Sequence, residues 1–279
     1  MPSFVVTPAV VLRSRPYGES DKIVSFFTEL HGKITGIAQG AKRSRRRFVN
    51  SLEPFSLVSL RFQERANASL AFIHACDLVR VFKSLTAHLD RIAHASYFME
   101  IVDGLVGERE ENRAIFTHLT NGLSRLDEHG SSLLLLTFFE LKLLALAGYQ
   151  PHLGQCRRCG TGWREHHGST KPVLSRVEGP VLSRVEGLTT KGGAWRFSLR
   201  DGGILCEGCA AFRKEALPLS REALGAIAAL QQTGRVPPNG DAFPLEVLGE
   251  SHLALLRFLQ FQIGRELKSA PFLEAYLLP

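Results

Sequence analysis

The stretch KIVSFFTELHGKITGIAQG, residues 22–40, decides how the N-terminal part of the chain folds. Two runs rich in Val, Ile, Phe and Thr flank ELHG, whose composition is typical of a turn between strands. Similar runs occupy residues 4–14, 55–63 and 70–79, the last with Cys76 as an expected buried thiol. Five short strands in about 80 residues predict a small closed barrel, and the five-stranded OB-fold is one common form of it. An SH3-like barrel or a small sandwich fits this periodicity as well.

Beyond residue 86 the hydrophobic pattern becomes helical, with apolar side chains every three to four positions as far as residue 148. Asn112 and Ser131 stand where helix N-caps are expected. The segment 131–148 is apolar almost all round, which predicts a helix buried by its neighbours. Two more helices are expected at 221–232 and 245–268.

Four of the five cysteines form two CxxC pairs, Cys156 with Cys159 and Cys206 with Cys209. Each pair offers two thiolates to one ion, and two pairs complete the tetrahedral shell that Zn²⁺ prefers in structural sites. Four cysteine ligands leave no position for a reactive water, so the expected zinc holds structure and does not catalyse. A disulfide or a thioredoxin-like redox pair is the alternative. Histidines also lie nearby, but a histidine ligand would leave one CxxC cysteine idle; they are His152, His166 and His167.

The segment QGAKRSRRRF, residues 39–48, carries five cations within six positions, and Glu53 is the first acid after it. Its cations are Lys42, Arg43, Arg45, Arg46 and Arg47, and Lys33 adds a sixth upstream. Such a loop between barrel strands can contact a phosphate backbone, whereas the alternative is a solvated turn. It is not a nucleotide-binding P-loop, because Ala41 separates Gly40 from Lys42. Aromatic residues that could stack on bases are each expected more often in the core: Tyr17, Phe48, Phe55 and Phe62.

Between the cysteine pairs the octapeptide PVLSRVEG occurs twice in tandem, at 172–179 and 180–187. Two copies are too few for a repeat architecture, and a surface loop tolerates such an insertion at small entropic cost, so we assign the repeat no function.

The predicted fold class is α+β. Its segments are an OB-fold DNA-binding domain at 1–80, the first part of a helical domain at 81–148, a zinc finger with a loop insertion at 149–210, and the second part of the helical domain at 211–279.

The net charge of +7 and the pI of 9.4 favour an anionic partner such as nucleic acid. No stretch approaches the roughly 20 apolar residues that span a bilayer, and the N-terminal residues lack the basic start of a signal peptide. We therefore expect a cytoplasmic protein without membrane contact, in which reduced thiols bind metal. No catalytic motif is recognisable, so the chain is not expected to be an enzyme.

Several segments, taken in order, resemble the bacterial recombination mediator family RecO. Two segments resemble the barrel of that family: YGESDKIVSFFTELHGKITGIAQGAKRSRRRF at 17–48 and LEPFSLVSLRF at 52–62. Its zinc finger is similar to GYQPHLGQCRRCG at 148–160 and FSLRDGGILCEGC at 197–209, and its C-terminal signature is similar to GRELKSAPFL at 264–273. The tandem insert departs from the family pattern. This departure affects the detailed geometry expected of the finger and leaves the implied function unchanged.

The resemblance implies an N-terminal OB-fold, a helical domain and a zinc finger. It implies a protein that binds single- and double-stranded DNA, anneals complementary strands and helps load RecA onto strands coated by single-strand-binding protein (SSB). The implied partners are RecR and the acidic C-terminal tail of SSB, and the implied place of action is the nucleoid. By position, the resemblance assigns DNA binding to the six cations named above and structural zinc to the four paired cysteines.

Two other functional classes fit parts of the sequence. An OB-like barrel with a zinc ribbon could bind RNA in translation or transcription, which a preference for structured RNA over single-stranded DNA would indicate. A zinc-dependent enzyme of nucleic-acid metabolism needs a metal with an open coordination position. For the SSB tail, we hypothesise a basic, apolar-lined groove with Arg257, Arg265 and Lys268 in the last long helix, although an exposed amphipathic face explains these residues as well.

Overall fold

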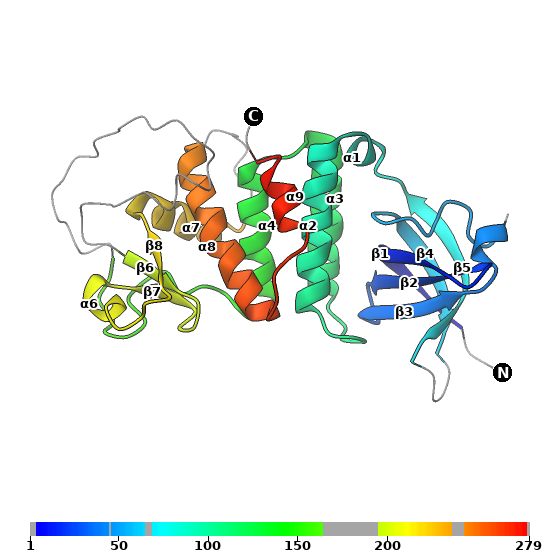
Figure 1. Ribbon diagram of the computed structural model, residues 1–279, viewed down its shortest axis with the longest axis horizontal. Coiled ribbons are helices and arrows are strands. Elements are labelled where there is room, and N and C mark those ends of the chain that lie inside the picture. Colours follow the sequence, from blue (N-terminus) through cyan, green and yellow to red (C-terminus); the bar gives the residue numbers. More distant parts are fainter. Residues whose placement is uncertain (1–3, 45, 65–68, 164–194, 236–242, 278–279) are drawn as a thin grey trace. The chain divides into compact units, whose positions relative to one another are not determined.

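The computed structural model describes residues 4–44, 46–64, 69–163, 195–235 and 243–277. The chain forms two compact units: Met1–Gly130 with Ser269–Leu273, and Ser131–Lys268 with Glu274–Pro279. Their helices and strands are labelled in Figure 1. The tandem repeat at 172–187, Arg45, His166 and His167 lie outside the described residues. The four domain ranges expected from the sequence stay a prediction.

The first unit begins with a closed barrel whose strand order is β1-β2-β3-β5-β4 (Figure 1). Its strands are β1 (Val5–Tyr17), β2 (Asp21–Thr28), β3 (Lys33–Ala38), β4 (Leu57–Gln63) and β5 (Ala71–Arg80). Strand β1 pairs antiparallel with both β2 and β4, while β3 and β5 run parallel. The five expected strands and the OB-like barrel are therefore confirmed.

The barrel closes where β3 meets β5, and this seam is short. Only Gly36 with Ala71 and Ile37 with Phe72 are paired along it. A Cβ on Gly36 would lie 2.8 Å from the backbone oxygen of Ala71 and would also collide with the side chain of Ile73. Glycine is therefore the residue that lets the two backbones approach closely enough to close the barrel.

Helices complete the first unit: α1 (Lys83–Ala87), α2 (Leu89–Leu105), α3 (Arg113–His129) and most of α9 (Ala270–Glu274). The predicted cap of α3 is confirmed, because the side chain of Asn112 accepts a hydrogen bond from the N–H of Ile115 at 3.0 Å. Helix α3 covers part of the barrel, since Phe116 contacts the ring of Phe27 on β2 edge to face.

The second unit contains α4 (Leu133–Leu146), α7 (Arg221–Thr233) and α8 (Leu245–Ile263), which contact one another. A small sheet of order β7-β6-β8 accompanies them, formed by β6 (Trp195–Ser198), β7 (Gly203–Leu205) and β8 (Leu217–Leu219), with the short helix α6 (Glu207–Ala210). Helix α4 is buried along most of its length, as its all-round hydrophobicity predicts. Within this core, Nδ1 of His252 on α8 lies 2.9 Å from a carboxylate oxygen of Glu140 on α4.

Two details of the helix predictions are wrong. Ser132 rather than Ser131 caps α4, because its hydroxyl accepts the N–H of Leu135 at 3.1 Å. Helix α8 ends at Ile263 rather than at residue 268, because Gly264 adopts a left-handed conformation with φ of 75° and terminates it. None of the helices in the described ranges is long and apolar enough to cross a membrane.

Candidate nucleic-acid interface and metal centre

The basic loop, residues 39–48, is anchored on the barrel by its apolar residues. It starts with a short 3-10 helix, η1 (Ala41–Arg43). The side chains of Ala41 and Phe48, followed by Leu52, belong to the buried core of the barrel. One side of the loop is therefore part of the barrel core, while Lys42, Arg43, Arg46 and Arg47 are exposed.

Strand β5 adds a backbone anchor through Cys76. The N–H of Cys76 donates to the carbonyl of Arg47 at 2.9 Å, and its thiol donates to the carbonyl of Ser51 at 3.4 Å. Cys76 is buried, as predicted, and this burial raises the pKa of its thiol to about 12. The chain after the basic loop thus runs along the part of β5 that lies beyond the short seam with β3.

Asp21, the first residue of β2, fixes the start of the basic loop. Its carboxylate accepts the N–H of Gly40 at 2.8 Å and the hydroxyl of Ser20 at 2.7 Å. These two hydrogen bonds, the one from Gly40 first, hold the pKa of Asp21 below its usual value. Gly40 has a φ of 67°, a left-handed conformation that suits glycine and turns the chain from β3 into η1.

Lys42 and Arg47 are held in place by backbone carbonyl groups. The ammonium of Lys42 donates to the carbonyl of Gly18 at 2.8 Å, and the guanidinium of Arg47 donates to that of Gln39 at 2.8 Å. The guanidinium of Arg47 also lies 5.1 Å from the centre of the Phe48 ring, within the range of a cation–π contact. A carbonyl positions a cation without neutralising its charge, so both side chains keep theirs.

Exposed positive charge therefore collects on the basic loop. Lys42, Arg43, Arg46 and Arg47 are exposed, and Arg45 lies outside the described residues. Within the described ranges none of these four cations forms an ion pair with a carboxylate. The loop can thus offer several unneutralised cations to a chain of phosphates.

Lys33, the sixth predicted contact, lies in a different environment. Its side chain is only 14% exposed and its ammonium lies 3.4 Å from the carboxylate of Asp103 on α2, which also pairs with Arg13. The ammonium donates to the carbonyls of Asp103 at 3.0 Å and Val106 at 3.2 Å, at the C-terminal end of the helix. A cation is favourable there because of the helix dipole. DNA contact by Lys33 stays a prediction.

The structure adds Arg15 to the candidates and singles out Tyr17, one of the four aromatic residues already considered. Both are exposed near the end of β1, where Tyr17 pairs with Asp21 and Arg15 with Ile23. Paired residues share one face of a sheet, so both side chains lie on the face that carries Asp21. The alternation in RSRPY, residues 13–17, is the sequence signal for this arrangement. Of the other aromatic candidates, Phe48 and Phe62 are buried and Phe55 is half-buried.

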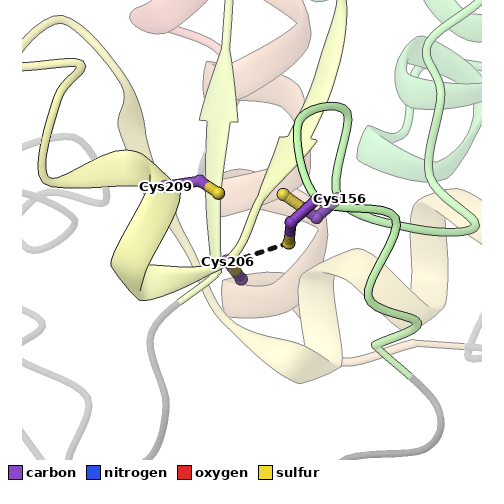
Figure 2. Close-up of side chains that lie close together, drawn as sticks. Cys156, Cys206 and Cys209 are labelled. Carbon is purple, nitrogen blue, oxygen red and sulfur yellow. Dashed lines mark hydrogen bonds between the residues drawn. The ribbon is translucent and has the colours of Figure 1, made fainter.

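The four paired cysteines form one cluster in the second unit. Their sulfur atoms all lie within 4.8 Å of one another, so Cys156, Cys159, Cys206 and Cys209 are positioned to hold a metal ion. Figure 2 shows the labelled side chains directed toward a common centre. His152 is exposed and is not a member of this cluster.

Backbone hydrogen bonds bring the two cysteine pairs together. His152 donates its N–H to Gly202 at 3.0 Å and accepts the N–H of Ile204 at 3.1 Å, and the N–H of Arg157 donates to Ile204 at 2.9 Å. The first pair is thereby joined to β7, whose end leads directly into Cys206. The segment before the second pair forms β6 and β7.

The thiols of the cluster differ in pKa. The hydroxyl of Thr161, 3.2 Å from the sulfur of Cys159, is the largest cause that lowers the pKa of Cys159 to about 6. The side chain of Cys206 is the largest cause that raises the pKa of Cys209 to about 12, because it favours the neutral thiol. Sulfur atoms this close cannot all be thiolates without a cation between them, which fits a metal-binding role.

The residues predicted for a groove are only partly on a helix. Arg257 is exposed on α8, one turn before the half-exposed ring of Phe261. Arg265 and Lys268 are exposed but follow the end of α8. The expectation that all three lie in this helix is therefore wrong, because Gly264 ends it.

Family models match nearly the whole chain. The model described as Recombination protein O N terminal matches residues 1–82, and that described as Recombination protein O C terminal matches residues 87–271. The chain is similar to the DNA repair protein RecO of Anaeromyxobacter dehalogenans (strain 2CP-C), with 36% identity over 95% of this chain and 94% of that protein. It is also similar to that of Geobacter sulfurreducens, with 33% identity over 95% of each chain. The corresponding protein of Syntrophus aciditrophicus is 31% identical over 96% of this chain and 94% of its own length.

Proposed function

Because this chain belongs to the RecO family of DNA repair proteins, we propose that it is a recombination mediator. In this role it binds single- and double-stranded DNA, anneals complementary strands and helps load RecA onto DNA coated by SSB. The observation that carries the proposal is the basic loop, in which carbonyl groups rather than carboxylates hold Lys42 and Arg47 and apolar residues pack into the barrel core.

The proposed mechanism rests on charge and involves no covalent step. Two DNA strands repel each other, and a cationic surface that contacts both lowers this repulsion and releases counterions. The basic loop is anchored at Gly40 and Phe48, so little ordering is needed when phosphates bind. We propose that the protein acts without nucleotide hydrolysis and is not an enzyme.

The ion that the four cysteines suit best is zinc. A tetrahedral Zn²⁺ with Zn–S bonds of about 2.3 Å places its sulfur ligands about 3.8 Å apart. The cluster, whose sulfurs lie within 4.8 Å of one another, fits this shell with small movements. Bound there, zinc supplies no reactive water position and joins the segment before β6 to the segment after β7.

We further propose RecR and the C-terminal tail of SSB as protein partners, with action in the cytoplasm at the nucleoid. A tail that is both acidic and apolar needs a surface with both a cation and apolar area. Arg257 and Phe261, one helical turn apart on α8, supply such a pair.

The experiment that tests the proposal is annealing of two complementary oligonucleotides, each coated with cognate SSB, without nucleotide. We expect the protein to accelerate annealing. Tight binding to bare DNA without acceleration would contradict the mediator role. Tighter binding to structured RNA than to single-stranded DNA would instead favour a ribonucleoprotein module.

A further inference from the structure

One aromatic side chain lies exposed beside the cations of the basic loop. Tyr17 is 53% exposed, whereas Phe48 and Phe62 are at most 5% exposed and belong to the barrel core. An aromatic ring that supports no core is free to offer its face to a planar ligand. Nucleobases are such ligands, and stacking on them needs no particular base sequence.

Three hydrogen bonds join the turn after Tyr17 to the basic loop. The ammonium and the backbone N–H of Lys42 donate to Gly18 at 2.8 Å and to Ser20 at 2.9 Å. The third is the bond from the N–H of Gly40 to Asp21, the register partner of Tyr17. These bonds hold the chain that follows Tyr17 against the start of the basic loop.

The charges around Tyr17 separate a side for phosphates from a side for bases. Lys42 and Arg43 on η1 attract a phosphate backbone, whereas Glu19, exposed in the turn two residues after Tyr17, repels it. A strand that runs along the cations therefore keeps its phosphates away from Glu19. Its bases are then the groups that can reach the ring of Tyr17.

From this arrangement we propose that Tyr17 stacks on an unpaired base of the strand whose phosphates contact the basic loop. The inference rests on the proposed function, because it assumes that the loop binds DNA. It deepens that function by assigning a residue that distinguishes strands. A base inside a duplex is already stacked and paired, so Tyr17 favours single-stranded over double-stranded DNA, which phosphate contacts alone do not.

The test compares an intact oligothymidylate with an oligonucleotide of equal length that has the same phosphates but abasic sites throughout. We expect the wild-type protein to bind the intact strand at least about fivefold more tightly, the weakest contribution expected of one stacked base. Tyr17→Leu should reduce this ratio to below about twofold and leave affinity for the abasic strand unchanged. Tyr17→Phe keeps an aromatic face and should retain the wild-type ratio.

Phe212→Leu is the matched control, because Phe212 is an exposed aromatic residue of the other unit, 78% exposed. It should leave both affinities unchanged. A wild-type ratio that persists in Tyr17→Leu overturns the inference, as does an equal loss of affinity for both strands. Absence of binding to either strand by the wild-type protein contradicts the proposed function itself, which separates the two failures.

Discussion

The carboxylate of Asp21 accepts the backbone N–H of Gly40 at 2.8 Å, and this bond ties the first residue of β2 to the start of the basic loop. Asp21→Ala removes the carboxylate and leaves the N–H of Gly40 without this acceptor. We expect faster trypsin cleavage within residues 39–48 and a several-fold weaker affinity for single-stranded DNA. Asp21→Asn keeps an oxygen that can accept this bond and should retain most of both properties. Equal trypsin sensitivity of the two variants would count against the bond as the anchor.

The same bond predicts a pH dependence. The folded-state pKa of Asp21 is lowered, with the hydrogen bond from Gly40 as the largest cause. Its stabilising contribution is therefore complete above the ordinary value of 3.8 and is lost only as the pH falls through the lower folded value. The amide proton shift of Gly40, followed by NMR, should titrate with a midpoint below 3.8 in the wild-type protein and should not show this titration in Asp21→Asn. A midpoint at or above that value would contradict the anchor.

Closure of the barrel depends on Gly36. In Gly36→Ala the new methyl group collides with the backbone oxygen of Ala71 and the side chain of Ile73. Backbone atoms cannot move aside without separating β3 from β5, so we expect a loss of unfolding free energy on the order of 2 kcal/mol. Denaturant unfolding measures this loss. Gly154→Ala is the control, because a Cβ there meets nothing within 4 Å, and it should change stability little.

The elements of the barrel were predictable from sequence because each is a local pattern. Alternating apolar residues define a strand such as β2, and CxxC spacing defines a metal ligand pair, whatever the rest of the chain does. The strand order could not be predicted from such local patterns. It depends on which strands meet, and the sequence left an SH3-like barrel and a sandwich open.

Side-chain roles that depend on distant partners could not be predicted. In the sequence Lys33 is one more cation. In the structure its ammonium donates to the carbonyls of Asp103 and Val106, about seventy residues later in the chain. Phe48 and Tyr17 are both aromatic residues near the cations, and only the path of the chain after Phe48 shows that it fills the barrel core. Gly264 is a sequence signal for the end of α8, but the apolar Leu267 continues the helical spacing beyond it and favours a longer helix.

The environment of Lys33 predicts a structural effect. Lys33→Gln removes the ammonium from the nearly buried carboxylate of Asp103, which keeps Arg13, so we expect a loss of about 1–3 kcal/mol in unfolding free energy. The control is Lys42→Gln, whose exposed ammonium bonds only a carbonyl, and it should change stability by less than about 0.5 kcal/mol. Of these two variants, only Lys42→Gln should reduce the salt dependence of the affinity for DNA. The opposite pattern would place Lys33 in contact with DNA.

Charge reversal of the basic loop tests the phosphate contacts directly. For single strands the slope of log K against log salt changes by about 0.7 for each phosphate contact. A variant with Arg43, Arg46 and Arg47 changed to Glu should therefore flatten the slope by about 2. Reversal of three exposed cations elsewhere, Lys83, Arg125 and Lys142, should leave the slope as it is. An unchanged slope in the loop variant would remove the basic loop from the interface.

The five cysteines should react in two groups that differ in what protects them. In the folded protein with metal bound, a thiol reagent at pH 8 should react slowly with the cluster. After a strong chelator removes the ion, it should react with four thiols. The fifth, Cys76, lies in the buried core of the barrel, so it should react only when the barrel unfolds in denaturant. Cys159→Ser should abolish stoichiometric metal binding measured by atomic emission, whereas Cys76→Ala should keep one ion per chain. A Cys159→Ser protein that still held one ion would show that the exposed member of the cluster is not a ligand.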